Sequence, residues 1–95
     1  MARRVEFLEE ARQDVLEARA WFETRGVAAT FTAELERAID QIAQLPEAWP
    51  LYSARERRYL FRRLHYSVIY RVQGEIIVVV AVAHERRRPG FWRGR

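Results

Sequence analysis

The stretch YSVIYRVQGEIIVVVAVA (Tyr66–Ala83) decides the fold, because it holds two strand-like segments separated by a turn. Its first part is rich in β-branched and aromatic residues, and its second part is almost continuously apolar. Gln73 and Gly74 between them suit a tight hairpin turn, in which a glycine supplies positive φ. The apolar run is typical of a central strand covered by helices on one face, although a buried helix has the same pattern. We therefore expect an antiparallel hairpin within a sheet.

Two shorter segments alternate polar and apolar residues, as half-buried strands do. They are RRVEF at residues 3–7 and RYLFRR at residues 58–63. Between these two segments, apolar residues recur at steps of three and four, which predicts two amphipathic helices. We expect the first helix to end at Gly26 and the second at Pro46. The stripe of the first helix consists of Ala11, Val15, Ala18 and Phe22, and that of the second consists of Ala28, Phe31, Leu35, Ala38, Ile42 and Leu45.

This order of elements predicts an α+β fold of the form β-α-α-β-β-β. We expect an N-terminal strand followed by an α-helical hairpin, which packs as one layer on a twisted antiparallel β-sheet. Trp21 and Trp49 either pack within this fold, which we expect, or contact a partner. Four carboxylates of the first helix are expected on a solvated face: Glu9, Glu10, Asp14 and Glu17. The expected core residues are Val15, Phe22, Phe31, Leu35, Ile42, Val68 and Val78.

The composition narrows the classes of protein to which the chain can belong. Its 95 residues suit a single domain spanning 1–95. It has no cysteine, which excludes disulfides and thiolate metal sites, and with only two histidines we expect neither a metal centre nor a cofactor. No apolar run approaches the roughly 20 residues of a membrane span, and the N-terminus lacks a signal-peptide core, so we expect a cytoplasmic protein without membrane contact.

The charge is unevenly divided along the chain. All 17 basic residues are arginine. Residues 1–50 carry 6 arginines and 10 acids, whereas residues 51–95 carry 11 arginines and 3 acids, so the halves have formal charges of −4 and +8. Arginine is suited to carboxylates, phosphates and aromatic faces. We expect an anionic partner to bind the C-terminal half.

The segment ERRRPGFW (Glu85–Trp92) admits three interpretations: a solvated fringe, a structural cap on the sheet, or an interface. A fringe would leave a tryptophan and a phenylalanine exposed without purpose. Arginine and tryptophan are enriched at binding hot spots. We therefore expect Trp92 to anchor the segment while its arginines face a partner. The expected partner-binding residues are Arg62, Arg63, Arg86, Arg87, Arg88 and Trp92.

The element order and three motifs together resemble the RelE/ParE superfamily of bacterial toxins, which are the toxin halves of type II toxin–antitoxin modules. The resemblance covers essentially the whole chain. Its motifs are EARQDVLEARAWFE in the first helix (residues 10–23) and AVAHERRRPGFW at residues 81–92. The third is a pattern in and after the second helix, formed by Phe31, Glu34, Leu35, Ala38, Ile39, Ile42, Leu45, Pro46 and Pro50.

The resemblance implies one of two activities. One branch of the superfamily cleaves messenger RNA on the ribosome, and the ParE branch, which includes plasmid stabilisation proteins, poisons DNA gyrase. Ribonuclease members supply lysines, arginines and a C-terminal tyrosine. This chain has no lysine, and it places Ser67 and Phe91 where that pattern has arginine and tyrosine. A further arginine position holds Glu85 or, with a shift of one residue, Arg86. These departures favour the ParE branch, acting by binding and not by covalent chemistry.

The implied partners are therefore DNA gyrase and a ParD-like antitoxin, through which the complex would bind operator DNA indirectly. The first alternative is a ribosome-dependent endoribonuclease with a rearranged site, in which His84 acts as acid or base beside Arg62 and Arg86. A second alternative is a non-toxic module that retains only affinity for its antitoxin. His65 is expected to be structural or solvated.

Overall fold

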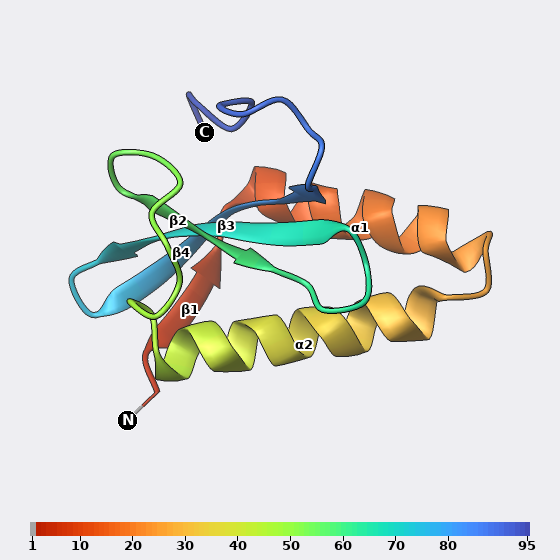
Figure 1. Cartoon of the computed structure of the whole chain (residues 1–95), viewed down its shortest axis with the longest axis horizontal. Helices are drawn as coiled ribbons and strands as arrows, with labels where there is room; N and C mark the ends of the chain where they lie inside the picture. Colours follow the sequence, from red (N-terminus) through yellow and green to blue (C-terminus); the bar gives the residue numbers. More distant parts are fainter. Residues whose placement is uncertain (1) are drawn as a thin grey trace.

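The elements follow the predicted order in the computed structural model, which describes residues 2–95 (Figure 1). Two helices follow the first strand, and three strands complete the chain, which confirms the predicted α+β architecture. The bounds are β1 Arg4–Phe7, α1 Glu9–Glu23, α2 Ala28–Gln44, β2 Glu56–Leu60, β3 Tyr66–Gln73 and β4 Ile76–His84.

The four strands form one sheet in the order β1-β4-β3-β2. β2, β3 and β4 are antiparallel, and Gly74 turns the β3–β4 hairpin with a φ of 61°. β1 instead runs parallel to β4, from Arg4 opposite Ile76 to Phe7 opposite Val79. The sheet is therefore mixed, where a wholly antiparallel sheet was expected. The helical hairpin returns the chain to β2 in the direction of β1, and the antiparallel pairs β2–β3 and β3–β4 then bring β4 into that same direction.

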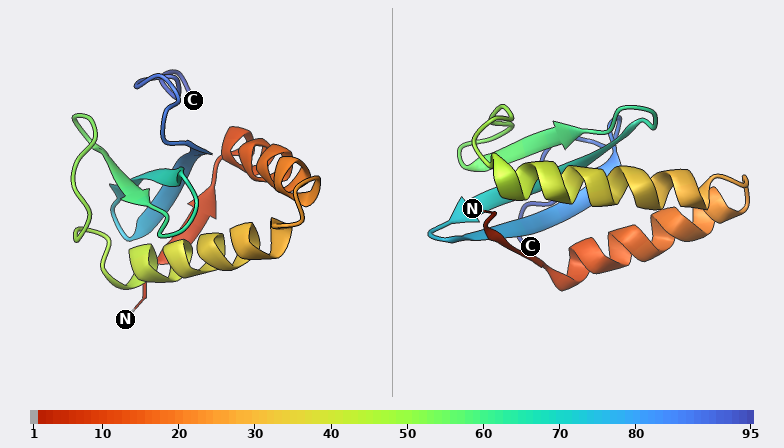
Figure 2. Two further views of the ribbon diagram at one scale, coloured as in Figure 1. Left: turned by 45° about the vertical axis from the view of Figure 1, so that its right-hand side comes forward. Right: turned by 90° about the horizontal axis from the view of Figure 1, so that it is seen from below.

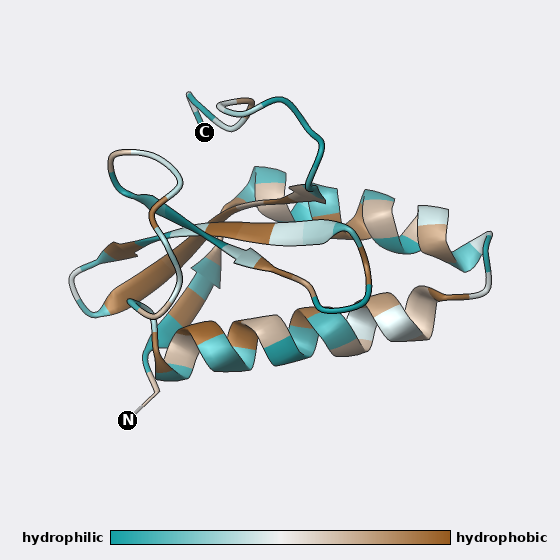
Figure 3. Ribbon diagram, in the orientation of Figure 1, coloured by the Kyte–Doolittle hydropathy of each residue, from teal (hydrophilic) through white to brown (hydrophobic). Residues whose placement is uncertain are grey.

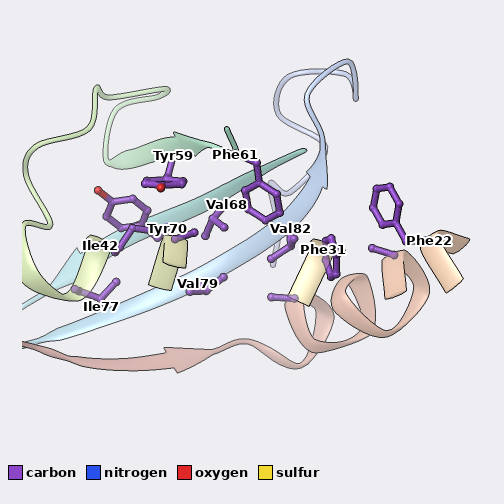
Figure 4. Close-up of a cluster of buried hydrophobic side chains, with 13 residues drawn as sticks. Phe22, Phe31, Ile42, Tyr59, Phe61, Val68, Tyr70, Ile77, Val79 and Val82 are labelled. Carbon is purple, nitrogen blue, oxygen red and sulfur yellow. The ribbon is translucent and has the colours of Figure 1, made fainter. Parts of the chain in front are cut away.

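The helical hairpin covers one face of the sheet, and the main core lies between the two layers (Figures 1 and 2). Phe22 and Phe31 come from the helices, and their rings stack with centroids 5.3 Å apart. Val68 of β3 and Val79 of β4 belong to the same buried cluster (Figure 4). Figure 3 shows that the most apolar segments of the sheet lie in β3 and β4, as the continuous apolar sequence requires.

Most of the expected core is confirmed. Phe22, Phe31, Ile42 and Val68 are buried, and Val15 and Leu35 are partly buried against them. Val78 is only half-buried, because Ile77 and Val79 point to the helices and successive side chains of a strand alternate between faces. Leu45 is 59 % exposed, because the helix ends one residue earlier and its stripe ends with it.

The acidic face of α1 is a correction to the sequence-based prediction. Glu9, Glu10 and Glu17 are exposed, but Asp14 is buried. It lies between Ala11 and Ala18 at helical spacings of three and four, and therefore on the buried stripe. Its carboxylate accepts a hydrogen bond from the backbone N–H of Val82 in β4, at 3.1 Å.

The opposite face of the sheet has a smaller apolar cluster of its own. Ile69, Val80 and Ala81 form it, and Trp92 folds back onto them from the C-terminal segment. The ring of Trp92 also lies 5.2 Å from that of Tyr52 in the loop before β2. The pairing register shifts between Ile69 and Tyr70, a β-bulge that turns this part of β4 towards Trp92. Figure 2 shows the C-terminal segment on the side of the sheet away from α2.

Candidate partner-binding surface

The fold brings the predicted arginines to one end of the sheet in two groups. Tyr66, at the start of β3, pairs with His84, at the end of β4. The loop before β3 and the segment after β4 are therefore neighbours, joined by a hydrogen bond of 2.9 Å from the backbone N–H of Glu85 to the carbonyl of His65. Arg62 and Arg63 lie in this loop, and the other three arginines follow β4 directly.

The loop group is fixed against α2. Phe61 anchors the loop in the core, and the backbone N–H of Arg63 donates a hydrogen bond to the carboxylate of Glu34, which is buried. Arg62 and Arg63 then line a pocket of about 450 Å³ together with Arg37 of α2. Sequence reasoning missed both Glu34 and Arg37 as parts of this site. Glu34 had a signal, because it lies on the buried stripe between Phe31 and Ala38.

The second group sits on a turn that follows β4. The N–H of Arg86 donates to Nδ1 of His84 at 3.1 Å, and the N–H of Arg87 donates to the His84 carbonyl at 2.9 Å. The guanidinium of Arg87 lies 4.3 Å from the ring centre of Phe91. All three side chains from Arg86 to Arg88 are exposed. Among the described residues 2–95, no carboxylate lies within ion-pair distance of these three arginines or of the two arginines of the loop group.

Trp92 is an anchor and not an open contact surface. Only 4 % of its surface is exposed, because it is packed on the sheet. A partner therefore reaches this tryptophan only if the C-terminal segment moves. The arginines of that segment project from the turn that Trp92 fixes.

A salt bridge that the sequence did not reveal closes the C-terminal segment. Arg95 donates to both carboxylate oxygens of Asp14, at 2.7 and 3.3 Å, and also to the carbonyl of Val80, at 3.1 Å. Beyond Phe7 the chain leaves the sheet for α1, so from there on the edge of β4 that faced β1 has no strand beside it. Asp14 and Arg95 bind the backbone groups of Val80 and Val82 that this departure leaves unpaired. We call this arrangement the Asp14–Arg95 clasp.

A second pocket, of about 380 Å³, lies between α1 and the end of β4. Trp21, which is 48 % exposed, and Tyr66 line it, together with His84 and Arg87. Burial and the nearby carboxylate of Asp14 raise the pKa of Tyr66, while Arg87 opposes the shift. The neutral phenol is therefore strongly favoured at physiological pH. Trp49, by contrast, packs 4.9 Å from Tyr59, as expected.

The three residues of the alternative ribonuclease site do not line one pocket. Arg62 lies in the pocket over α2, and His84 lies in the pocket beside α1. His84 uses Nδ1 to accept from Arg86, which leaves Nε2 as its available donor. Ser67 is buried, with its hydroxyl directed to the carbonyl of Ala83. His65 is exposed and lies 3.2 Å from Glu85.

Within residues 2–95, no set of three or more histidine, aspartate or glutamate side chains is placed to hold a metal ion. The helices of that same span are each too short or too polar to cross a membrane.

Comparison with known proteins gives one family and several structural relatives. The model of a family described as the ParE toxin of the type II toxin–antitoxin system parDE matches residues 5–89. No curated protein matches the chain in sequence.

Among solved structures, a mutant of the E. coli toxin RelE in the free state is similar with a TM-score of 0.68 and 20 % identity, over 90 % of this chain and 86 % of that one. The chromosomal ParDE system from P. aeruginosa is similar with a TM-score of 0.68 and 14 % identity, over 87 % and 96 %. The RelBE2 toxin–antitoxin complex from Mycobacterium tuberculosis is similar with a TM-score of 0.60 and 23 % identity, over 88 % and 99 %. At these identities the likeness establishes a shared fold.

Proposed function

This chain belongs to the ParE toxin family of type II toxin–antitoxin systems, within the RelE/ParE superfamily, and from that premise we propose that it inhibits DNA gyrase by binding. The proposed partner that neutralises it is a ParD-like antitoxin, through which the complex contacts operator DNA. The proposed contact residues for these partners are the arginines of the two groups, with Trp92 holding the second group in place. No covalent step by this chain is required.

One observation favours binding over RNA cleavage: His84, Arg62 and Arg86, which form the alternative ribonuclease site, do not line one pocket, although Tyr66 and Arg87 lie beside His84. Cleavage through a ribose 2′-hydroxyl requires a base, an acid and a cation around one phosphate. His84 and Arg62 line separate pockets, and the hydroxyl of Ser67 is buried. A binding protein has no such requirement, because separate arginine groups can contact separate parts of a large partner.

The apolar surface supports an antitoxin that wraps around the chain. A groove of about 510 Å³ between β1 and α2 is lined by Phe7, Leu35 and Ile39, and it suits one face of an amphipathic segment. On the other side, Leu51 and Leu60 are exposed at a pocket of about 460 Å³. The similar ParDE and RelBE2 structures are, by their own descriptions, a toxin–antitoxin system and complex. We propose that a partly acidic extension of the same antitoxin lies along the second arginine group, Arg86–Arg88.

Induction of the chain in a bacterial host without antitoxin tests the target. DNA and protein synthesis are labelled separately after a short pulse. We expect DNA synthesis to stop first, with filamentous cells and an SOS response. Arrest of translation first, with cleaved messenger RNA, would reject the gyrase proposal in favour of the ribonuclease. Normal growth despite soluble expression would support the non-toxic binding module instead.

His84→Asn gives a matched comparison in the same assay, because the Asn side-chain oxygen can still accept the hydrogen bond from the N–H of Arg86 while the imidazole is removed. Its side chain is exposed, so we expect the fold to persist. Under the gyrase proposal this variant keeps its toxicity, whereas under the ribonuclease alternative it loses the acid or base and its toxicity with it.

A further inference from the structure

The pocket over α2 combines three cations from two elements. Arg37 projects from α2, and Arg62 and Arg63 come from the loop between β2 and β3, which bends towards α2 in Figure 1. The pocket contains one carboxylate, that of Glu34, which is occupied by the backbone N–H of Arg63. Among the described residues 2–95, the three guanidinium groups have no carboxylate within ion-pair distance.

Three arginines that line one pocket without an ion-pair partner favour an oxyanion. Their side chains repel one another, and an anion between them removes that repulsion while each planar fork donates two hydrogen bonds. The loop is held rigidly enough to maintain this arrangement, because Phe61 anchors it in the core and Glu34 binds its backbone. A pre-positioned loop reduces the entropy that binding would otherwise cost.

The remaining lining of the pocket favours a phosphate group over an acidic peptide. It consists of Ala29, Ala33 and Thr30, so it offers a hydroxyl and two methyl groups but no aromatic or large aliphatic side chain. Peptide-binding sites bury aromatic and aliphatic anchors. Phosphate oxygens are instead bound by arginine, threonine and backbone donors. The aromatic lining that a peptide needs is found elsewhere, in the pocket that includes Trp49 and Leu51.

The position of the loop favours a polymer over a free phosphate ion. Its first part lines the pocket, and its last residue, His65, is hydrogen-bonded to the N–H of Glu85. The second arginine group begins at the next residue, Arg86. A phosphodiester strand that enters the pocket can therefore extend to a second set of cations.

We propose that Arg37, Arg62 and Arg63 form a phosphodiester-binding pocket with which this protein holds a nucleic-acid backbone directly. This contact is independent of sequence and separate from any operator contact made by an antitoxin. It adds a second ligand to the proposed gyrase inhibition, because gyrase acts while bound to DNA. The pocket itself does not depend on gyrase being the target.

Fluorescence anisotropy of the purified chain with a labelled DNA duplex of about 20 base pairs tests the proposal between about 50 and 200 mM salt. A single-stranded RNA of equal length separates the two sources of phosphodiester. The test variant carries Arg37→Gln, Arg62→Gln and Arg63→Gln. We expect its affinity at the lower salt concentration to fall about tenfold or more, and the slope of log affinity against log salt to fall by about 2 to 3, since each lost phosphate contact removes about 0.9.

The matched control removes the same charge from the exposed residues Arg4, Arg12 and Arg19. It should keep the salt slope of the parent chain, and circular dichroism should show both variants folded. Tighter binding of RNA than of DNA, lost in the test variant, supports the pocket and identifies RNA as its ligand. Equal losses in both variants, no loss in the test variant, or stronger competition by poly-glutamate than by unlabelled DNA would overturn the proposal. None of these measurements requires gyrase, so a failed gyrase assay leaves their outcome intact.

Discussion

Tyr70 joins the sheet to the loop that follows α2. Its side chain is fully buried, and its hydroxyl donates a hydrogen bond to the carbonyl of Pro46. Tyr70→Phe keeps the ring but leaves that carbonyl buried without this donor. We expect the free energy of unfolding at pH 7 to fall by about 1 to 2 kcal/mol, which urea unfolding measures. Tyr52→Phe, at a half-buried ring on the other face, should change the stability less.

Tyr70 should also make the fold sensitive to alkali. Burial raises the pKa of Tyr70 from 10.0 to about 12, with Arg57 opposing the shift. The folded state therefore holds the phenolic proton more tightly than the unfolded chain does. The resulting stability is fully present below pH 10 and is lost as pH rises to about 12. Urea unfolding across that range should show a shallower loss for Tyr70→Phe than for the parent chain, and an identical loss would contradict this assignment.

Two acids show what the sequence could and could not predict at single residues. Asp14 and Glu34 occupy buried stripes of their helices, so periodicity alone indicates that each needs a partner inside the fold. The sequence could not predict the partners, because they lie far along the chain. They are Val82 and Arg95 for Asp14, and the backbone of Arg63 for Glu34. Arg37 was missed for the same reason, since only the folded loop brings it beside Arg62.

At the scale of elements, the spacing of apolar residues predicted the order of strands and helices, but it did not predict the direction of β1. Apolar residues at every second position indicate a strand, but they do not indicate which strand lies beside it. β1 ends opposite Val79, so beyond that residue β4 is paired with β3 on one edge only and its other edge is open. The Asp14–Arg95 clasp forms at that open edge of β4, so the topology of the sheet explains why the C-terminal segment is held there.

The clasp should stabilise the segment from Arg86 onwards. Asp14→Asn keeps an oxygen for the N–H of Val82 but removes the charge that binds Arg95. Because the pair is largely buried, we expect a loss of about 1 to 3 kcal/mol in the free energy of unfolding. Hydrogen exchange measured by NMR should become faster at the backbone amides of Phe91, Arg93 and Arg95, whose donors close the turns of this segment.

Glu17→Gln, an exposed change one turn further along α1, is the control for the clasp and should leave both quantities unchanged. Arg95→Ala should reproduce the effect of Asp14→Asn, and the double variant should add little to either single change. Additive losses would mean that the two side chains stabilise the fold separately and that the clasp is not a unit.

At the scale of the whole molecule, the separation of charge along the sequence becomes a separation in space. The acidic half contributes the helices, and the basic half places its unpaired arginines at the end of the sheet where β3 begins and β4 ends. Two further basic residues of that half are already engaged: Arg71 pairs with Glu56 at 3.7 Å, and Arg58 lies 4.5 Å from the ring centre of Tyr52. The two arginine groups therefore concentrate unpaired positive charge at that end of the sheet, which should steer an anionic partner there.

Charge reversal of Arg86, Arg87 and Arg88 to glutamate tests whether the second group meets the target. In a supercoiling assay with purified bacterial gyrase, we expect the concentration for half-inhibition to rise about tenfold or more, with a weaker dependence on salt. Reversal of Arg4, Arg12 and Arg19 alters the net charge equally and should have little effect. Because Arg87 stacks on Phe91, hydrogen exchange at the amide of Arg95 must first show that the clasp is intact. Unchanged inhibition by a variant with an intact clasp would remove this group from the target interface and leave the pocket over α2 as the remaining cationic surface.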